Sequence, residues 1–309
     1  MLYQTKTSKK NNLKFNRLKL ILHKVKFIAK NVIYIKNFSS EIKKSNNTLA
    51  NSLPIILNYP SLKNTLFSDN EFEINIVAGN HELAKDAQRL RYKSFFNETQ
   101  DDQLIDVDEY DVLSDHLVVV DKSKLKNNVV GTYRLLSSSK LPRKNFYTST
   151  EFNIDNLLKQ KSSILEVGRS CVDSNYRDGR IIRLLWKGLI LYFLQNDIDY
   201  VIGCASFFEK DSKKLDLALS YLHYFHRPPK YIESRPILKK RFNWNLIKKK
   251  QLNKTEIFRK LPPLIKGYIR TGSWVCSGAI YDKVFDTFDV CIILKVSNLE
   301  EKYSRLARN

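Results

Sequence analysis

The chain has 309 residues, of which 43% are hydrophobic and 12% aromatic, and its 53 Lys and Arg outnumber 32 Asp and Glu, giving a formal net charge of +21. This composition predicts a folded, basic protein of one large or two ordinary domains, and it excludes a wholly disordered, collagenous or coiled-coil chain. No apolar run reaches the roughly 18 residues that a membrane-spanning helix requires. The four cysteines include no CxxC pair, so we expect buried thiols of a reducing cytosol.

The positive charge is concentrated in two segments. Residues 1–70 have a net charge of +11 and residues 230–266 a net charge of +10, so the remainder of the chain is neutral. Two basic segments beside a neutral body indicate surfaces that meet an anionic partner. An alternative is compositional bias, because a chain rich in Lys, Asn and Ile gains positive charge without any partner.

The first basic segment contains a predicted amphipathic helix. In residues 13–35, apolar side chains recur at steps of three and four, with lysine and arginine between them. This pattern is typical of a helix lying in an anionic membrane interface, and its interrupting lysines argue against a secretory signal. We therefore expect a cytoplasmic protein that is peripheral at the inner face of the membrane. The predicted division is an N-terminal helix and linker at 1–70 and one domain at 71–309, with a core at 71–229 and a basic segment and C-terminal strands at 230–309.

From residue 72 the pattern changes to alternating strands and helices. In chain order it predicts a strand at 72–77, a helix capped by Asn80 and ending near Phe95, strands at 117–120, 129–136 and 164–172, a helix at 180–195, a strand at 200–205 and a helix at 211–225. The acidic stretch at 101–115 is expected to be too polar for the core. A strand, a short Arg/Gly turn and a helix also meet at 176–180, and such a junction can bind phosphate through the free N–H groups of the helix.

Several strings taken together resemble a branch of the GNAT fold that contains acyl-homoserine lactone synthases and ornithine-acyl carrier protein N-acyltransferases. They are LEVGRSCV at 165–172 followed by YR at 176–177, DEYD at 108–111, DHL at 115–117 and GTYRLL at 131–136. Two further strings, GCASF at 203–207 and LPPLIKGY at 261–268, resemble the ornithine acyltransferases specifically. The resemblance covers residues 72 to about 296 and leaves residues 1–60 outside it.

This resemblance implies an α/β (α+β) architecture, a GNAT-like acyltransferase fold with a mixed central sheet flanked by helices. It implies transfer of a 3-hydroxy fatty acyl group from acyl carrier protein to the α-amine of L-ornithine, which gives lyso-ornithine lipid. The acyl-acyl carrier protein is then the donor, and no cofactor or metal is expected. The partners implied are acyl carrier protein, L-ornithine and an anionic membrane surface.

Aminolysis of a thioester requires a site that holds an ammonium group, removes a proton from it and stabilises an oxyanion. We expect Asp108 and Asp111 to anchor the substrate ammonium groups, with Arg134 of the arginine motif also binding substrate. An acidic, solvated loop or a helix cap is the structural alternative for the two aspartates. Glu166 lies inside an apolar strand, where a carboxylate must be paired or used.

Glu166 is therefore the predicted general base, acting directly or through water. Arg169 is expected to pair with Glu166 or to bind the substrate carboxylate, and purely structural pairing of Glu166 with Arg134 or Arg169 is the alternative. Tyr221 occupies the position where many GNAT enzymes carry the acid that protonates the departing thiolate, although core packing explains this residue equally well.

The donor is expected to bind through charge and apolar surface. Arg177, Gly179 and Arg180 are predicted to receive the pantetheine phosphate, because glycine allows close approach of the backbone. An acidic carrier protein would dock on the basic patch, unless that patch is only a solvated loop. The patch is formed by Lys239, Lys240, Arg241, Lys248, Lys249 and Lys250. The expected lining of an acyl tunnel is Trp186, Phe193, Phe207 and Phe225, each of which could instead be ordinary core.

Two other functions compete with this prediction. An acyl-homoserine lactone synthase would use S-adenosylmethionine as the amine donor, but the strings at 203–207 and 261–268 favour ornithine. A non-catalytic protein that binds nucleic acid or anionic lipid would explain the net charge. We expect no nucleic acid partner, because the folded body is neutral and DNA-binding modules usually carry their charge on the folded core.

Overall fold

The computed structural model describes residues 65–96, 104–125, 128–141 and 145–299. The predicted amphipathic helix at 13–35 and most of the predicted linker lie outside these described residues. Within the described ranges, no helix combines the length and hydrophobicity that crossing a bilayer would demand.

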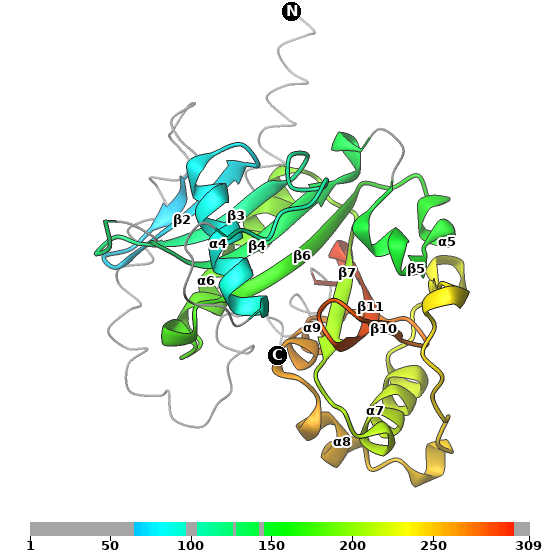
Figure 1. Cartoon of the computed structure of the whole chain (residues 1–309). Helices are drawn as coiled ribbons and strands as arrows, with labels where there is room; N and C mark the ends of the chain where they lie inside the picture. The colour runs from blue at the N-terminus through cyan, green and yellow to red at the C-terminus, as the bar shows by residue number, and fades with distance from the viewer. Residues whose placement is uncertain (1–64, 97–103, 126–127, 142–144, 300–309) are drawn as a thin grey trace, which may run out of the picture.

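Up to residue 225 the elements follow one another as the hydrophobic pattern predicts, with several short additions (Figure 1). Strands are also present in the C-terminal part, as predicted, together with two helices between 254 and 271 that were not predicted. The helices are α4 (Glu82–Phe96), α5 (Asp155–Leu158), α6 (Arg180–Gln195), α7 (Ser212–Phe225), α8 (Lys254–Lys260) and α9 (Pro263–Thr271). The strands are β1 (Thr65–Ser68), β2 (Phe72–Ala78), β3 (Asp115–Asp121), β4 (Val129–Ser137), β5 (Phe152–Asn153), β6 (Ile164–Val172), β7 (Tyr200–Phe207), β8 (Arg235–Pro236), β9 (Trp274–Val275), β10 (Ile280–Asp282) and β11 (Thr287–Lys295). Short 3-10 turns include η2 (Tyr147–Thr150) and η3 (Ser174–Tyr176).

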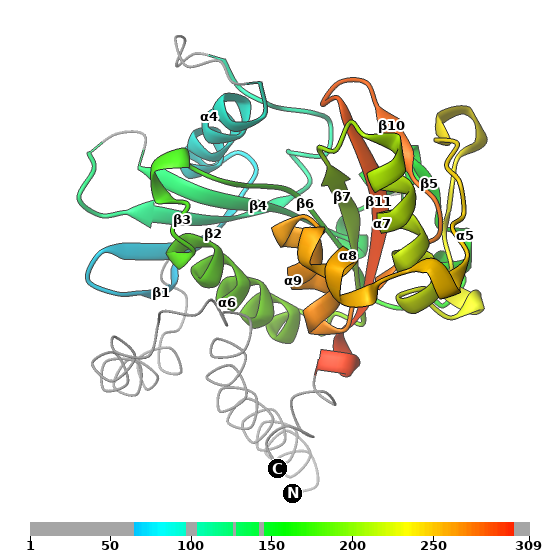
Figure 2. The ribbon, with the colours of Figure 1, turned by 90° about the horizontal axis from the view of Figure 1, so that it is seen from below.

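Among the described residues, one mixed sheet runs in the order β1-β2-β3-β4-β6-β7-β11-β10, with β9 paired to β11. Only the pairing of β6 with β7 is parallel, and the other strand pairs in this sheet are antiparallel. Helix α4 covers one face and α6 the opposite face, as Figure 2 shows for the strands between them. This architecture confirms the predicted GNAT-like fold with a mixed central sheet flanked by helices.

Alternating side chains explain how the two helices share the sheet. Leu117 and Val119 of β3 pack with α6, whereas Val118 and Val120 pack with α4. All nine residues of β4 are buried, since this strand lies between two neighbours and has a helix on each face. The four cysteines are free thiols; three of them are buried, as expected, whereas Cys204 is partly exposed.

The structure differs from the expectations near the start of the domain. The sheet begins at Thr65, inside the segment expected to be linker, because β1 pairs with β2. Helix α4 begins at Glu82 rather than after Asn80, and the Nδ1 atom of His81 accepts a hydrogen bond from the Leu83 N–H at 3.1 Å. His81 therefore does the capping that was assigned to Asn80.

Strands β6 and β7 diverge part of the way along their length. Their pairing runs from Ile164 opposite Tyr200 to Glu166 opposite Ile202, and it ends there. At Gly203 a Cβ atom would lie 2.3 Å from the carbonyl oxygen of Val167, so only glycine fits where the strands begin to separate. On the other side of β6, the pairing with β4 shifts register between Thr132 and Arg134, and Arg169 takes a φ of 51°. The glycine at 203 and the register shift between β4 and β6 thus accompany the separation of β6 from β7 at the centre of the sheet.

Candidate active site

An apolar cavity lies on the α6 side of the point where β6 and β7 separate. Val167 and Gly203 of the two strands line it, together with Trp186, Leu189 and Phe193 of α6. Tyr268 of α9 closes it from a third direction. Trp186 and Phe193 of the predicted tunnel therefore line the cavity. Phe207 and Phe225 do not, because they pack in the hydrophobic cluster around α7. The lining of this cavity is mainly apolar, which suits an apolar ligand.

The predicted phosphate turn precedes α6. Gly179 has a φ of 93°, a conformation that side chains disfavour, and a Cβ atom there would meet open space. Arg177 and Arg180 are exposed, and Arg180 pairs with Asp178 and Glu71, each at 2.7 Å. Arg180 is the first residue of a helix of 16 residues, whose dipole favours an anion at this end, and Arg177 donates a hydrogen bond to the carbonyl of Val172 at the end of β6.

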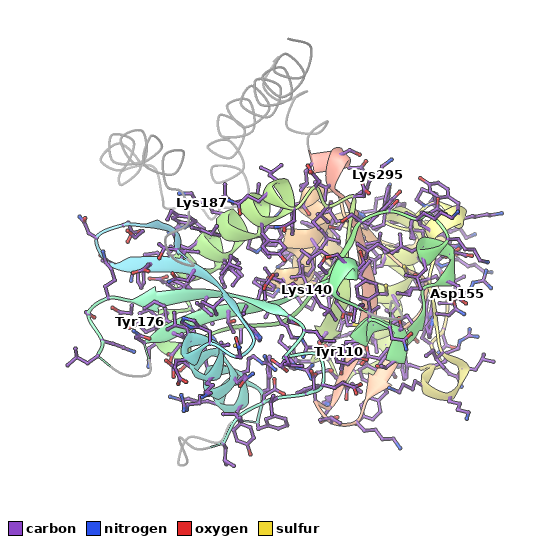
Figure 3. All side chains as sticks on the ribbon, turned by 90° about the horizontal axis from the view of Figure 1, so that it is seen from above. Tyr110, Lys140, Asp155, Tyr176, Lys187 and Lys295 are labelled. Carbon is purple, nitrogen blue, oxygen red and sulfur yellow. The ribbon has the colours of Figure 1, made fainter. Side chains whose placement is uncertain are left out.

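The side chain of Tyr176, which lies between β6 and α6 in the sequence, holds this turn against the sheet. Tyr176 of η3, which is labelled in Figure 3, donates a hydrogen bond to Asp121 of β3 at 2.5 Å. Its ring meets that of Phe72 edge-on. This contact holds the turn at the end of the sheet where the helix starts.

Two aspartates of the acidic stretch after α4, Asp106 and Asp111, are buried, although most of the described residues of this stretch are exposed or partly exposed, as its polarity predicts. Arg91, which has no exposed surface, contacts Asp106 at 2.7 Å and Asp111 at 2.5 Å. Arg134 contacts Asp111 at 3.1 Å and Asp108 at 2.5 Å. With Arg169 added, three arginines balance three aspartates, and this paired charge is what allows Asp106 and Asp111 to be buried. We call these six residues the arginine–aspartate network.

Asp111 has no surface left for a substrate ammonium group. It is 1% exposed, and both of its carboxylate oxygens accept hydrogen bonds from guanidinium groups. Burial opposes its charge, but Arg91 and Arg134 hold the pKa of the Asp111 carboxyl well below its usual range. Arg134, 3% exposed, is likewise committed to Asp108 and Asp111. Asp108 is the more open of these aspartates, with a side chain 23% exposed.

Glu166 is buried on the face of β6 that lies opposite α6. Its Oε2 accepts a hydrogen bond from the Tyr147 N–H at 2.8 Å, and its Oε1 accepts bonds from the N–H and the hydroxyl of Thr148. Among the described residues it forms no ion pair with Arg134 or Arg169, so neither predicted pairing is present. Burial raises the pKa of Glu166 above its ordinary value, while the bonds from Thr148 act in the opposite direction.

Arg169 instead joins the arginine–aspartate network. Its guanidinium lies 3.1 Å from Asp106 and 3.1 Å from Asp108, with its side chain 13% exposed. The same group lies 4.8 Å from the ring centre of Tyr147 and 5.1 Å from that of Phe285. The bulge in β6 thus presents a guanidinium between two aromatic rings, next to the backbone of the separated strands.

A second acidic cluster lies on this same face. Glu151, which follows η2, and Asp282 and Asp289, from β10 and β11, each offer a carboxylate oxygen within 4.8 Å of the others. Burial raises the pKa of Glu151 to about 7, and it also raises the pKa of Asp289. We call these three residues the carboxylate triad.

Tyr221 is placed in the hydrophobic cluster around α7. Its hydroxyl lies 3.0 Å from the His226 Nε2, and its ring packs on Phe225. It is not among the residues that line the cavity, so its arrangement favours the core-packing alternative. The tyrosine that does line the cavity is Tyr268, whose hydroxyl lies 3.4 Å from that of buried Tyr133.

The basic patch is exposed but divided. Residues 239–241 neighbour β10, where Arg241 forms a bridge with Ile280. Residues 248–250 lie near α7, where Lys249 approaches the ring of Phe225 at 5.3 Å. The two groups of basic residues were predicted to form one patch because they are close in the sequence.

Sequence reasoning missed Arg91, Tyr147, Tyr268 and the carboxylate triad. Only Arg91 carried a usable signal, since it falls on the buried face of α4 with Ala84 and Ala87. A charged residue on an apolar stripe must be paired. Tyr147, Tyr268 and the carboxylate triad gave no such signal, because only the folded chain brings them near the other residues of the site.

The sequence and the fold of this chain are similar to those of known proteins. A model of the family described as Acetyltransferase (GNAT) domain matches residues 90–187. This match agrees with the mixed sheet and its two covering helices, and it points to an acyltransferase of the GNAT class.

Two curated relatives narrow the class. The chain is 35% identical over 240 residues to the L-ornithine N(alpha)-acyltransferase of Agrobacterium fabrum, covering 74% of this chain and 82% of the relative. It is 36% identical over 232 residues to the protein of the same name from Rhizobium meliloti, covering 70% and 78%. The chain belongs to the L-ornithine N(alpha)-acyltransferase family. Among solved structures, the acyl-homoserine lactone synthase LasI aligns with a TM-score of 0.41 and 14% identity, covering 74% of this chain and 91% of that one.

Proposed function

We propose that this enzyme transfers a 3-hydroxy fatty acyl group from acyl carrier protein to the α-amine of L-ornithine, which forms lyso-ornithine lipid. An amide C–N bond forms and the thioester C–S bond breaks. The α-ammonium loses one proton before attack, and the proton lost from nitrogen afterwards ends on the departing thiolate. The names of the two relatives support L-ornithine as the acceptor and its α-amine as the group that is acylated.

The separation of β6 and β7 is the observation that carries the proposal. It leaves unpaired backbone on both strands, with an apolar cavity on one face and charged groups on the other. A thioester placed between the strands would have its acyl chain in the cavity and its carbonyl carbon within reach of an amine from the charged face. Backbone N–H groups of the bulge after Val167 are suited to stabilise the oxyanion.

Glu166 is the proposed base for the α-ammonium group. Burial raises its pKa, which makes its carboxylate a stronger base than an exposed glutamate. Its Oε1 already accepts two hydrogen bonds from Thr148, whereas its Oε2 accepts one and keeps a lone pair for a proton from the substrate or from a bridging water. Through Tyr147 and Thr148 the same carboxylate also holds η2, and Tyr147 contacts Arg169. We assign Arg169 to the carboxylate of the acceptor.

We assign the protonation of the departing thiolate to Tyr268 rather than to Tyr221. Tyr268 lines the cavity, and burial raises its pKa well above the ordinary value, so the hydroxyl stays protonated until a strong base forms beside it. Tyr133 lies 3.4 Å away and can replace the hydrogen bond when the proton leaves.

The donor is proposed to enter from the phosphate turn. Arg177, Gly179 and the N-terminus of α6 would receive the pantetheine phosphate, and phosphate would compete with Asp178 for Arg180. The carrier protein, which is acidic, would meet the exposed lysines of the basic patch. An anionic membrane surface would be reached through residues 13–35, and deleting them should then reduce binding to anionic vesicles.

The test is an assay with purified enzyme, 3-hydroxyacyl carrier protein and L-ornithine, with the product measured by mass spectrometry. Glu166→Gln should lower the turnover by at least about 100-fold, because general base catalysis contributes roughly 10²–10⁴-fold. Glu256→Gln, an exposed glutamate on α8, is the matched control and should keep wild-type activity. Full activity in Glu166→Gln, with an unchanged pH profile, would remove Glu166 from the mechanism. Absence of acylornithine with the wild-type enzyme would refute the function.

A further inference from the structure

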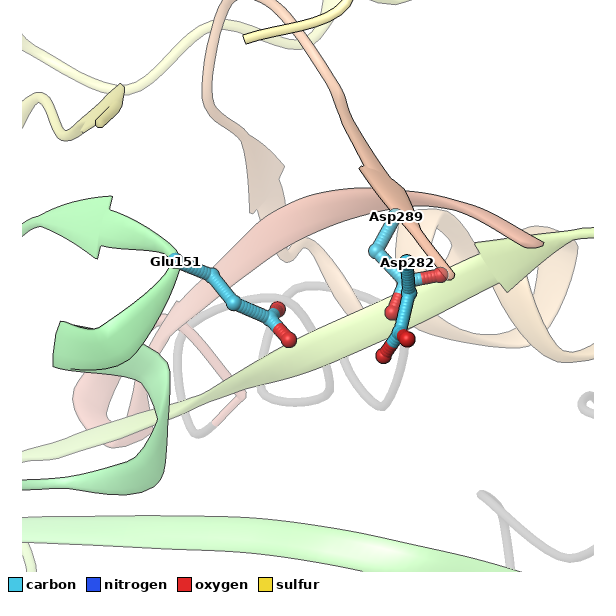
Figure 4. Close-up of side chains that lie close together, drawn as sticks. All are labelled: Glu151, Asp282 and Asp289. Atoms are coloured by element: carbon cyan, nitrogen blue, oxygen red, sulfur yellow. The ribbon is translucent and has the colours of Figure 1, made fainter. Parts of the chain in front are cut away.

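The carboxylate triad is assembled from separate parts of the chain. Figure 4 shows the Glu151 side chain extending from the segment before β5 toward Asp282 and Asp289, which lie on the β10–β11 hairpin. Glu151 is 2% exposed and Asp289 is 5% exposed. Three acidic side chains are thus brought together in a place that excludes most water.

No basic side chain among the described residues forms an ion pair with any member of the triad. The contrast with the arginine–aspartate network is direct, since there each aspartate is matched by an arginine. The Oε2 atom of Glu151 is buried and has no hydrogen-bond partner within the described structure. Asp289 accepts a hydrogen bond from the Thr287 hydroxyl, and Asp282 accepts bonds from the N–H groups of Val284 and Phe285, so these two carboxylates have donors but no counterion. Buried carboxylates without a counterion are costly, so this arrangement is completed by a cation or by protons.

The triad lies at the edge of the separated strands. Asp289 is opposite Ser206 in the pairing of β11 with β7, and Cys204 on the same strand donates a hydrogen bond to Thr148, three residues before Glu151. Cys204 follows Gly203 and lines the cavity. Tyr147, which contacts Arg169, lies four residues before Glu151 in the same turn region. A small molecule held between Arg169 and the triad would therefore reach the opening between β6 and β7.

We propose that the carboxylate triad binds the side-chain ammonium group of the amino acid acceptor. This inference rests on the proposed function, which supplies an acceptor with one carboxylate and two amines. Three oxygens no more than 4.8 Å apart can each lie about 2.8 Å from one central atom, which is the length of an N–H···O bond. An ammonium group with three donors matches three carboxylate oxygens.

The triad then decides which amine reacts. An ammonium group held by carboxylates stays protonated and has no free electron pair, so it cannot attack the thioester. The α-amine, placed at the opening near Glu166, is left as the nucleophile. Loss of the triad should weaken binding of a diamino acid and leave a monoamino acid of the same length unaffected.

The experiment compares L-ornithine with L-norvaline, which has the same carbon chain without the side-chain amine. Binding is measured by calorimetry and turnover with 3-hydroxyacyl carrier protein, using the full chain and the variants Glu151→Gln and Asp289→Asn. We expect both variants to raise the Kd and KM for ornithine by at least about tenfold, the range for a lost charged hydrogen bond. The values for norvaline should stay within about twofold of wild type. Glu256→Gln is the control for an exposed acid.

Each outcome decides the proposal. Equal losses for ornithine and norvaline would assign the triad a structural role and overturn it. Binding of Mg²⁺ or Ca²⁺ by the wild-type protein but not by Glu151→Gln, with no change in ornithine binding, would also overturn it. If the wild-type enzyme binds ornithine through the triad but forms no acylornithine, the proposed function fails and this inference stands. If it acylates ornithine and the variants do not discriminate, the inference alone fails.

The pH dependence of binding gives a second readout. Burial raises the pKa of Glu151 to about 7, so this carboxyl is protonated below that pH and charged above it. Ornithine binding should therefore strengthen from about pH 6 to about pH 8, and the rise should be absent in Glu151→Gln. The other titratable or charged groups that act on Glu151 are Asp289, Asp282, Cys204, Lys240 and Tyr147. A rise of equal size in Glu151→Gln would assign it to one of these groups.

Discussion

Replacing Gly203 by alanine tests whether the opening between β6 and β7 is built by close backbone contact. The new methyl would lie 2.3 Å from the carbonyl oxygen of Val167, so the two strands would have to move apart by about an ångström to reach an ordinary contact. Overpacking of this kind costs about 1–3 kcal/mol. For a domain of this size, that loss lowers Tm by roughly 2–12 °C. Because the displacement falls where the thioester is proposed to lie, turnover should fall by about 100-fold.

Gly168→Ala is the matched control, because a Cβ atom there has no neighbour within 4 Å. We expect its Tm to stay within about 2 °C of wild type. If the open space beside Gly168 receives substrate, this variant should still lose turnover. Thermal denaturation and the acyltransferase assay, performed on both proteins, separate the two effects. Wild-type Tm and turnover in Gly203→Ala would refute the reasoning about the opening.

Three further predictions concern the network, the donor and the acyl chain. Arg91→Leu leaves buried Asp111 without its main counterion and should destabilise the fold by about 3–5 kcal/mol in urea denaturation; a change below about 1 kcal/mol would contradict the role of the network. Arg177→Ala should raise the KM for acyl carrier protein about tenfold at low salt, with a smaller effect at high salt, whereas Lys85→Ala on α4, at the opposite face, should leave it unchanged. Leu189→Trp should shift the products toward shorter acyl chains in mass spectrometry, and an unchanged profile would exclude the cavity as the acyl site.

Local pattern was enough to predict the main strands and helices from β2 to α7, whereas α8, α9 and the bounds of the C-terminal strands were not predicted. The bounds 164–172 and 180–195 agree with β6 and α6, because a continuous apolar strand, a polar turn and a long apolar helix are each signalled within a few residues. The start of α4 was less well determined, since Asn80 and His81 can both cap a helix and only the structure selects His81. Strand β1 was not predicted, because four residues are too few to show a clear strand pattern. They form a strand because they pair with β2.

The sequence by itself determined which residues form the strand, turn and helix around 164–195, because those signals are local and depend on periodicity and on glycine. It also singled out Glu166 as a carboxylate that must be accommodated. Only the tertiary structure decided that Asp111 is enclosed by Arg91 and Arg134, and that Glu151 meets two aspartates from the far end of the chain. Whether two charges pair depends on the distance between them in space. Residues separated by more than a hundred positions in the sequence come within that distance only when the chain folds and the strands pair in the sheet.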